Sequence, residues 1–340
     1  MKRSMIAGLC VLAGVLAIAS AAQAVVIDTV PVGNTGNTGE LSGTGAGGFG
    51  PDRICGAVAY TYNIGKYEVT AGQYTVFLNA VAATDTYGLY STSMWSSEYG
   101  CKIEQTDTGS GYSYSVASAW ADRPVNYVSF WDACRFANWL HNGQPTGAQG
   151  AGTTETGAYT LDGYNGGDGQ TIQRNPGWKW ALTSEDEWYK AAYHKNDGDT
   201  GNYFDYATSN DSLPSNDLVS PDPGNNANFY DGHFTIDSPY YRTPVGEFEN
   251  SESPYGTFDQ CGNVLEWNEA IVYAGEGWCY RGLRGGAYAY GGLYAAHRNY
   301  NDPSEYSFTG FRVSEVPEPA TMSLLALGGL GMLISRRKKN

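Results

Sequence analysis

Cysteine and histidine are the residue types in this 340-residue chain that could carry redox or metal chemistry. None of the six cysteines has a Cys-x-x-Cys partner or the Cys/His spacing that a zinc site requires. The four histidines show no ligand spacing either, so we expect surface or hydrogen-bonding roles for His141, His194, His233 and His297. The sequence therefore predicts no zinc centre.

Four arginines between residues 281 and 312 could bind anions or carbonyls. A guanidinium is a multidentate donor that suits loop-rich interiors, so we expect these residues to tie loops together rather than to bind a substrate. They are Arg281, Arg284, Arg298 and Arg312. Large flat rings are seldom exposed, so we expect core positions for Trp131, Trp139, Trp188 and Trp267.

The N-terminus has the layout of a secretory signal peptide. Lys2 and Arg3 precede an apolar run over residues 5–19, and a small-x-small cleavage site ends at Ala24. The run is too short for the roughly 20 apolar residues of a membrane-spanning helix, so we expect a signal peptide over residues 1–24. Cys10 leaves with it, and the remaining cysteines are Cys55, Cys101, Cys134, Cys261 and Cys279. One or two disulfides could form outside the cytoplasm, and the odd number leaves at least one thiol unpaired within the monomer.

Residues 315–340 combine a short motif, an apolar segment and a basic end. The apolar segment covers residues 320–334, basic residues follow at 336–339, and the preceding motif is Val316, Pro317, Glu318 and Pro319. Fifteen residues rise about 22 Å as a helix, which spans a bilayer marginally, and the basic end would stay on the cytoplasmic side. We expect a hydrophobic helix here rather than a tail packed on the domain.

This ending resembles the PEP-CTERM sorting signal of envelope proteins in exopolysaccharide-making bacteria. The resemblance implies that a membrane transpeptidase, an exosortase, is a partner and removes the tail. It also implies export to the cell envelope or the extracellular space, with transient anchoring in the inner membrane by the C-terminal helix.

The charge balance argues against nucleic acid as a partner. The formal net charge is −15, becomes −17 without Lys2 and Arg3, and reaches −21 when the four basic residues at 336–339 are also removed. A domain this acidic repels nucleic acids and anionic membranes, and it suits divalent cations and an extracellular setting.

The remaining residues, 25–314, are enough for one large domain. The 45 glycines and 27 tyrosines indicate tight turns, short strands and aromatic packing. Glycine-rich stretches at 33–50 and 143–169 are expected to be loops, the second a surface insertion with nothing to contribute to a core. Helices are predicted after the caps Thr70, Ser129 and Ser184, and strands over 25–32, 57–64, 264–267 and 311–313. The sequence therefore predicts a single loop-rich α+β domain.

Five motifs, taken in order, resemble the formylglycine-generating enzyme (sulfatase-modifying factor) family, whose fold is a variant of the C-type-lectin-like fold. They occupy residues 67–74, 123–140, 182–192, 262–267 and 281–313, and they include Gly262-Asn-Val-Leu-Glu-Trp267 and Arg281-Gly-Leu-Arg-Gly-Gly286. The match covers nearly all of the chain between its ends. Any one motif is weak, but five in order at sensible separations are a specific signal.

The resemblance implies oxidase activity only where two cysteines are present. Active members hold copper on two cysteines five residues apart, shortly after the Gly-Gly motif, and oxidise a sulfatase cysteine to formylglycine. The matching positions here are Tyr290 and Ala295, and neither can bind copper(I), which requires soft thiolates. We therefore expect no copper and favour a non-enzymatic role, with an oxidoreductase of the same family as the alternative.

The resemblance also implies structural calcium sites, which take clustered hard oxygen ligands. The first set combines two carboxylates with two carbonyls, from Asp259, Glu266, Gly262 and Val264. The second combines side-chain and carbonyl oxygens from Asn228, Phe229 and Asp237, with a further carbonyl near Pro239. A simpler interpretation of the first set is that Asp259 caps a turn and Glu266 pairs with an arginine.

The leading hypothesis is a non-catalytic, calcium-stabilised module that binds a ligand or partner, with a surface polysaccharide or a protein as candidates. Tyrosine gives wide, rigid contact area at little entropic cost, so we expect the binding cleft at the Tyr-rich segment 288–300. Its expected members are Arg284, Tyr288, Tyr290, Tyr294, His297 and Arg298. A structural matrix protein with no specific ligand is a second alternative.

Overall fold

The computed structural model describes residues 24–316 of the chain. Most of the expected signal peptide and the expected C-terminal helix lie outside the described residues, as do Pro317, Glu318 and Pro319 of the sorting motif. Within residues 24–316, no helix is long and apolar enough to cross a membrane.

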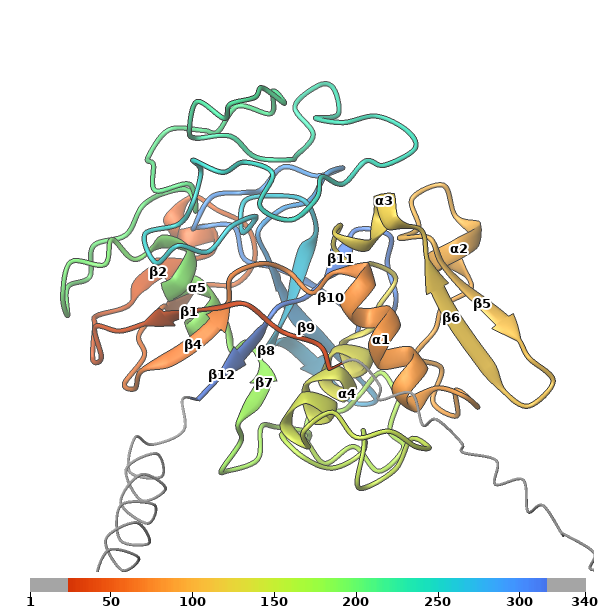
Figure 1. Cartoon of the computed structure of the whole chain (residues 1–340). Helices are drawn as coiled ribbons and strands as arrows, with labels where there is room; N and C mark the ends of the chain where they lie inside the picture. The colour runs from red at the N-terminus through yellow and green to blue at the C-terminus, as the bar shows by residue number, and fades with distance from the viewer. Residues whose placement is uncertain (1–23, 317–340) are drawn as a thin grey trace, which may run out of the picture.

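Two four-stranded sheets form the framework of the domain (Figure 1). The first is antiparallel and runs in the order β1 (Thr29–Val32), β4 (Tyr62–Gly65), β12 (Val313–Glu315) and β7 (Trp180–Leu182). The second runs in the order β10 (Asn299–Asn301), β9 (Trp278–Arg284), β8 (Leu265–Gly275) and β11 (Thr309–Gly310). Because β4 pairs with both β1 and β12, the first sheet joins the two ends of the domain.

The remaining strands form two smaller hairpins. One pairs β2 (Glu40–Ser42) with β3 (Arg53–Cys55), and the other pairs β5 (Ile103–Asp107) with β6 (Tyr112–Val116). The first lies within and beside the glycine-rich stretch 33–50, which also contains the short helix η1 (Thr44–Ala46). That stretch is therefore more ordered than a plain loop.

All three predicted helices are confirmed: α1 (Ala71–Val81), α4 (Phe130–His141) and α5 (Glu185–Tyr193). Each begins with a reciprocal capping box, as when Ser184 Oγ accepts from Glu187 N while Glu187 accepts from Ser184 N. Two single-turn helices were not predicted, α2 (Ser93–Ser96) and α3 (Ser118–Ala121).

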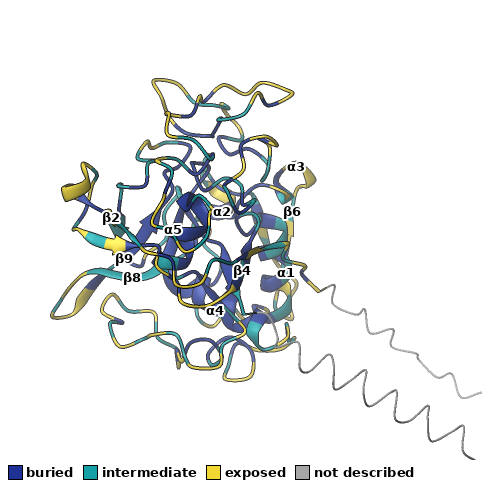
Figure 2. Ribbon diagram, turned by 90° about the vertical axis from the view of Figure 1, so that its left-hand side faces the viewer, coloured by how far each residue is buried: buried dark blue, intermediate teal, exposed yellow. Residues whose placement is uncertain are grey.

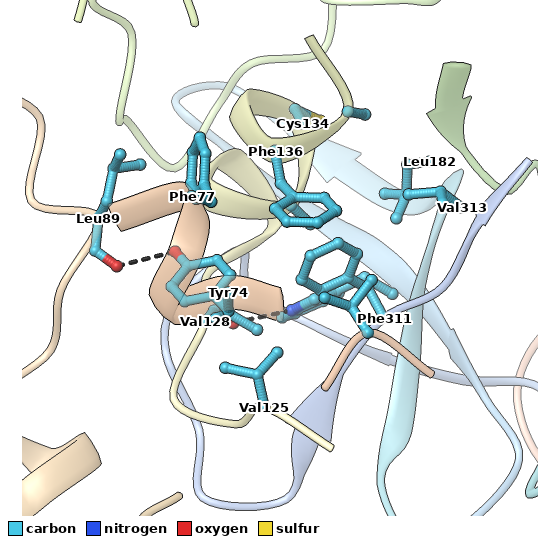
Figure 3. Packing of buried hydrophobic residues seen from close by; sticks show 14 of the residues in the cluster. Tyr74, Phe77, Leu89, Val125, Val128, Cys134, Phe136, Leu182, Phe311 and Val313 are labelled. Carbon is cyan, nitrogen blue, oxygen red and sulfur yellow. Dashed lines mark hydrogen bonds between the residues drawn. The ribbon is translucent and has the colours of Figure 1, made fainter. Parts of the chain in front are cut away.

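The main core lies between α1, α4 and the strands of both sheets (Figure 3). The Phe136 ring contacts Phe77 and Phe311 at centroid distances of 5.3 and 5.4 Å. Buried polar groups find partners there, since Tyr74 Oη donates to Leu89 O over 2.8 Å. The core placement expected for the four tryptophans is confirmed: Trp131, Trp139, Trp188 and Trp267 are all buried.

The expectation that residues 143–169 contribute nothing to the core was wrong. Ala158, Tyr159 and Leu161 are buried members of the main core. An ion pair between Glu155 and Arg135 of α4, 2.7 Å long, holds the segment in place. A glycine-rich stretch can thus contribute core residues when a buried charge pair fixes its path.

The long segment 194–264 contains no helix or strand and forms the large loop region at the top of Figure 1. In Figure 2, buried residues concentrate in the centre and exposed residues follow the peripheral loops. The predicted class, a single loop-rich α+β domain, is confirmed.

Candidate functional site

A buried ionic cluster lies where α5, β9 and the segment around Arg298 meet. Glu185, the first residue of α5, accepts from Arg284 Nη2 over 2.8 Å and from Arg298 Nε and Nη2 over 2.8 and 2.9 Å. Arg53 approaches the same carboxylate from the partly exposed side, at 3.3 Å. The helix N-terminus adds favourable partial charge for a carboxylate at this position.

Electrostatics keep the Glu185 carboxyl ionised. Burial by itself raises its pKa, but the Arg284 and Arg298 guanidinium groups outweigh burial and hold the pKa at about 2. The three side chains Glu185, Arg284 and Arg298 are at most 5% exposed. We call these three residues the ionic cluster.

The two arginines of the ionic cluster also hydrogen-bond to backbone carbonyls of neighbouring loops. Arg284 Nη1 donates to the carbonyls of Ala295 and His297 over 2.9 and 3.2 Å, and Arg298 Nη1 donates to Pro51 O over 3.3 Å. The expectation that these arginines tie loops together through carbonyls and carboxylates is confirmed.

Close packing of two glycines places Phe49 against this backbone. Phe49 forms a bridge with His297, and Phe49 O accepts from Arg298 N over 3.0 Å. A Cβ at Gly48 would lie 1.9 Å from Ala296 O, and one at Gly50 would lie 2.2 Å from Arg298 O. Only glycine allows the two chain segments to approach so closely at these positions.

A continuous set of aromatic side chains covers the outer side of this arrangement. Four rings stack in sequence, with centroids 5.3–5.7 Å apart and interplanar angles of 12–20°: His297, Phe49, Tyr300 and Tyr280. Three further rings flank the stack, at 4.9–5.5 Å: Tyr294, Tyr273 and Trp278. We call these seven residues the aromatic strip. All seven are at least partly exposed.

The second sheet supplies four of these rings: Tyr273 from β8, Trp278 and Tyr280 from β9, and Tyr300 from β10. Tyr273 of β8 lies directly opposite Tyr280 of β9 after two register shifts in β8. Such bulges re-aim side chains, and here they bring two tyrosines to one face. Trp278 and Tyr280 alternate along β9 with the buried Cys279 and Arg281, as the two-residue period of a strand requires.

The six residues expected to line one cleft do not do so. Arg284 and Arg298 belong to the buried cluster, and Tyr288 is also buried, with its ring 5.9 Å from that of Tyr241. Tyr290 is 48% exposed but packs on Phe308, outside the strip. Only Tyr294 and His297 join the strip, so segment 288–300 divides between interior and surface.

Sequence reasoning missed Glu185, Phe49 and three aromatic residues of the second sheet, Tyr273, Trp278 and Tyr280, whereas Tyr300 lies in the expected segment 288–300. Glu185 was visible only as part of the acidic first turn of a capped helix, which a favourable helix dipole already explains. The alternation of Trp278 and Tyr280 with apolar or buried neighbours was the one local signal for the strip. Nothing local to Phe49 indicates its contact with His297.

The first proposed calcium set is occupied by protein partners. Glu266 accepts from Arg312 Nε and Nη2 over 2.6 and 2.7 Å, and from Trp188 Nε1 over 2.8 Å. Asp259 accepts from Gly246 N over 2.7 Å, and burial raises its pKa to about 6. The loop that carries Gly262 and Val264 joins these residues, and the contacts of Glu266 are those of the simpler interpretation, a carboxylate paired with an arginine. Calcium at this set stays a prediction.

The second calcium set contains an unsatisfied oxygen. Asn228 is buried and its Nδ2 donates to Tyr241 O and Asn263 Oδ1, both over 3.0 Å, whereas its Oδ1 has no partner. The Phe229 carbonyl accepts from Asn216 Nδ2 over 3.3 Å, and the Asp237 side chain is exposed. A buried amide oxygen without a donor fits a cation ligand. Among the described residues, no three His, Cys, Asp or Glu side chains are grouped as a metal site.

The cysteines offer no pair for copper in the segment where the family places it. All five cysteines of the described chain are unpaired and buried. Tyr290 and Ala295 occupy the positions expected for the copper ligands. The Cys261 thiol contacts this segment, where it donates to Leu293 O over 3.7 Å. A phenol and a methyl group do not fit copper(I).

Together, the fold and the sorting motif define an exported protein with a sulfatase-modifying-factor type of domain. A family model described as "Sulfatase-modifying factor enzyme 1-like domain" matches residues 39–316, and a PEP-CTERM protein-sorting motif matches residues 315–338. The chain belongs to this sulfatase-modifying factor family. The sorting motif indicates export with envelope association and an exosortase as a partner.

CarF and Treponema denticola variable protein 1, two solved structures, support the fold. CarF shares 22% identity over 86% of this chain and 99% of its own, with a TM-score of 0.50. Treponema denticola variable protein 1 shares 18% identity over 85% of this chain and 95% of its own, with a TM-score of 0.51. PvdO from Pseudomonas aeruginosa shares 19% identity, over 85% of this chain and 94% of its own, with a TM-score of 0.47. No curated protein matches the chain in sequence.

Proposed function

We propose that this protein is a non-catalytic binding module of the cell envelope, built on a sulfatase-modifying-factor frame. The observation that carries the proposal is the aromatic strip, an exposed surface whose backbone is fixed from beneath by the ionic cluster. Rigid scaffolds that present fixed surface side chains suit recognition, because little conformational freedom is lost on binding.

Residue identity supports the absence of oxidase chemistry. Tyr290 and Ala295 replace the thiolates on which the family's copper chemistry depends. The side chain of Tyr290 lies at the surface, and that of Ala295 is buried in an apolar cluster. These two side chains therefore cannot bind one metal ion together.

We propose the second set as the calcium site. Asn228 Oδ1 would be its buried ligand, with Asp237 available from the exposed loop nearby in sequence. Calcium accepts six to eight oxygen ligands, including carbonyls and waters, so two side chains can be enough protein anchors. Its contribution would be to stabilise the strand-free segment 194–264.

In this proposal, the C-terminal apolar segment would act as a temporary inner-membrane anchor that the exosortase removes. The binding module then stays with the envelope or leaves the cell. A surface polysaccharide and a surface protein are both compatible with this location.

A peptide-oxidation assay tests the non-catalytic proposal. The full chain is loaded with copper(I) and incubated aerobically with a sulfatase-type Cys-x-Pro-x-Arg peptide, and formylglycine is measured by mass spectrometry. We expect no conversion. Turnover by the wild-type chain, lost in a Cys261→Ser variant, would show an oxidase of unusual design instead.

A further inference from the structure

We propose that the aromatic strip binds a chain of neutral sugars, with the rings stacking on sugar faces. This inference rests on the proposed binding function and names both its surface and the class of its ligand. Phe49, Tyr273 and Trp278 are the most exposed members of the strip, at 43%, 41% and 43% exposure. Contiguous exposed aromatic surface of this kind marks an interaction site.

The geometry of the strip leaves ring surface available for a ligand. Stacked rings with centroids more than 5 Å apart are displaced sideways, so each covers only part of its neighbour. The rings lie in contact one after another from His297 through Phe49 and Tyr300 to Tyr280 and Trp278, and all of them are at least partly exposed. A run of this kind suits a polymer with repeated faces better than a single small molecule.

The chemistry of the rings matches that of a pyranose. One face of a sugar ring presents C–H groups, which pack favourably on the electron-rich face of an aromatic ring. The sugar's hydroxyl groups lie around its edge, where phenol hydroxyls and an indole N–H can hydrogen-bond to them. The strip supplies these edge groups from Tyr273, Tyr280, Tyr294, Tyr300 and Trp278.

Charge favours a neutral polymer over an acidic one. The charged residues within three positions of a strip member are either acidic or buried. Asp52, Glu276 and Asp302 are acidic, while Arg281 and Arg298 are buried in the protein. The chain as a whole also carries a net charge of −15. The partly exposed Arg53 nearby is already paired with Asp186 and Glu185, so a polyanion would meet net repulsion at the strip.

Rigidity makes weak stacking contacts sufficient. The ionic cluster fixes the carbonyls of Ala295 and His297, and the Gly48 and Gly50 contacts fix Phe49 between them. Because these groups are ordered before binding, the ligand's stacking energy is not consumed in ordering them.

Affinity electrophoresis of the full chain tests the inference. Native gels contain hydroxyethyl cellulose, dextran or galactomannan as neutral polysaccharides, or alginate as an acidic one. We expect retardation by at least one neutral polymer and none by alginate. Removing one stacking ring should weaken retention about tenfold in Trp278→Ala and in Tyr300→Ala. Tyr300→Phe keeps the ring and should keep most of the retention.

Trp95→Ala is the matched control, because Trp95 is 46% exposed and makes no ring contact with the strip. Its retention should equal that of the wild type. Equal loss in strip and control variants, retardation by alginate alone, or no retardation by any neutral polymer would overturn the inference.

Two outcomes separate this inference from the proposed function, and a third tests whether a second copy of the chain occupies the strip. If the Trp278→Ala and Tyr300→Ala variants are both retained as strongly as the wild type, binding lies elsewhere on the protein. That result would refute the inference and leave the proposed binding function intact. Formylglycine formation in the peptide assay would instead remove the proposed function. A dimer in sedimentation that Trp278→Ala converts to monomer would show that a second copy of the chain occupies the strip, against the inference.

Discussion

Replacing Glu185 by glutamine removes the negative charge at the centre of the ionic cluster and keeps the side chain's shape. Arg284 and Arg298 would then be two buried guanidinium groups without a carboxylate, since Glu185 is the carboxylate that both contact. Arg53 is affected less, because Asp186 remains as its partner at 2.6 Å.

Two estimates of the size of this effect agree. Removing one partner of a buried ion pair costs about 3–5 kcal/mol. Independently, a carboxyl whose pKa falls from 4.5 to about 2 on folding stabilises the native state by about 3 kcal/mol. We therefore expect Glu185→Gln to lower the free energy of unfolding by about 3–5 kcal/mol at neutral pH.

Urea denaturation measures the difference, with Asp186→Asn as the matched control. The Asp186–Arg53 pair is partly exposed, with side chains 27% and 36% exposed, so its loss should cost no more than about 1 kcal/mol. If both variants lose the same small amount, the ionic cluster does not stabilise this region and the reasoning fails.

The same pKa fixes the pH dependence of the effect. The folded pKa of Glu185 lies below its unfolded value, so its stabilisation is fully present above about pH 5 and is lost as the pH falls towards 2. The wild-type and Glu185→Gln proteins should therefore approach each other in stability between pH 5 and 2. A stability difference that stays constant across this range would contradict the assigned role.

Other substitutions test the packing and the calcium proposal. Gly48→Ala should destabilise the fold by about 1–3 kcal/mol because its Cβ meets Ala296 O, whereas Gly291→Ala, with no atom within 4 Å, should leave urea denaturation unchanged or shifted slightly upward. Phe311→Ala should cost about 3–5 kcal/mol in the same assay, and a loss below 1 kcal/mol would contradict the described core. Calcium at one hundred times its dissociation constant should stabilise the wild type by about 2.7 kcal/mol relative to chelator, and Asn228→Leu should abolish the difference. An equal calcium response in both proteins would exclude Asn228 as a ligand.

The helix starts could be predicted from sequence because the residues that cap a helix lie next to one another in the chain. Thr70, Ser129 and Ser184 each lie three residues before a reciprocal partner, so the helix starts are encoded within four residues. The strands were located less accurately. The expected strand at 57–64 is realised as Tyr62–Gly65, since cross-strand partners far away in sequence decide where pairing begins.

The candidate site could be predicted only in part, for a physical reason. A Tyr-rich segment reveals the presence of rings, but the fold decides which of them face solvent. Tyr288 turns inward while Tyr294 and His297 remain at the surface. Phe49 joins the strip through the close contact of its glycine neighbours with the segment around His297, far away in sequence. Glu185, from a helix that lies in sequence between Phe49 and that segment, binds Arg298 beneath the strip.

Hydrogen–deuterium exchange of the full chain, with and without a retained neutral polysaccharide, tests most directly that the aromatic strip is the binding surface. The account predicts added protection in segments 48–50, 273–280 and 294–301, where the strip residues lie. Protection confined to segments 287–290 and 306–308, around Tyr290 and Phe308, would contradict it.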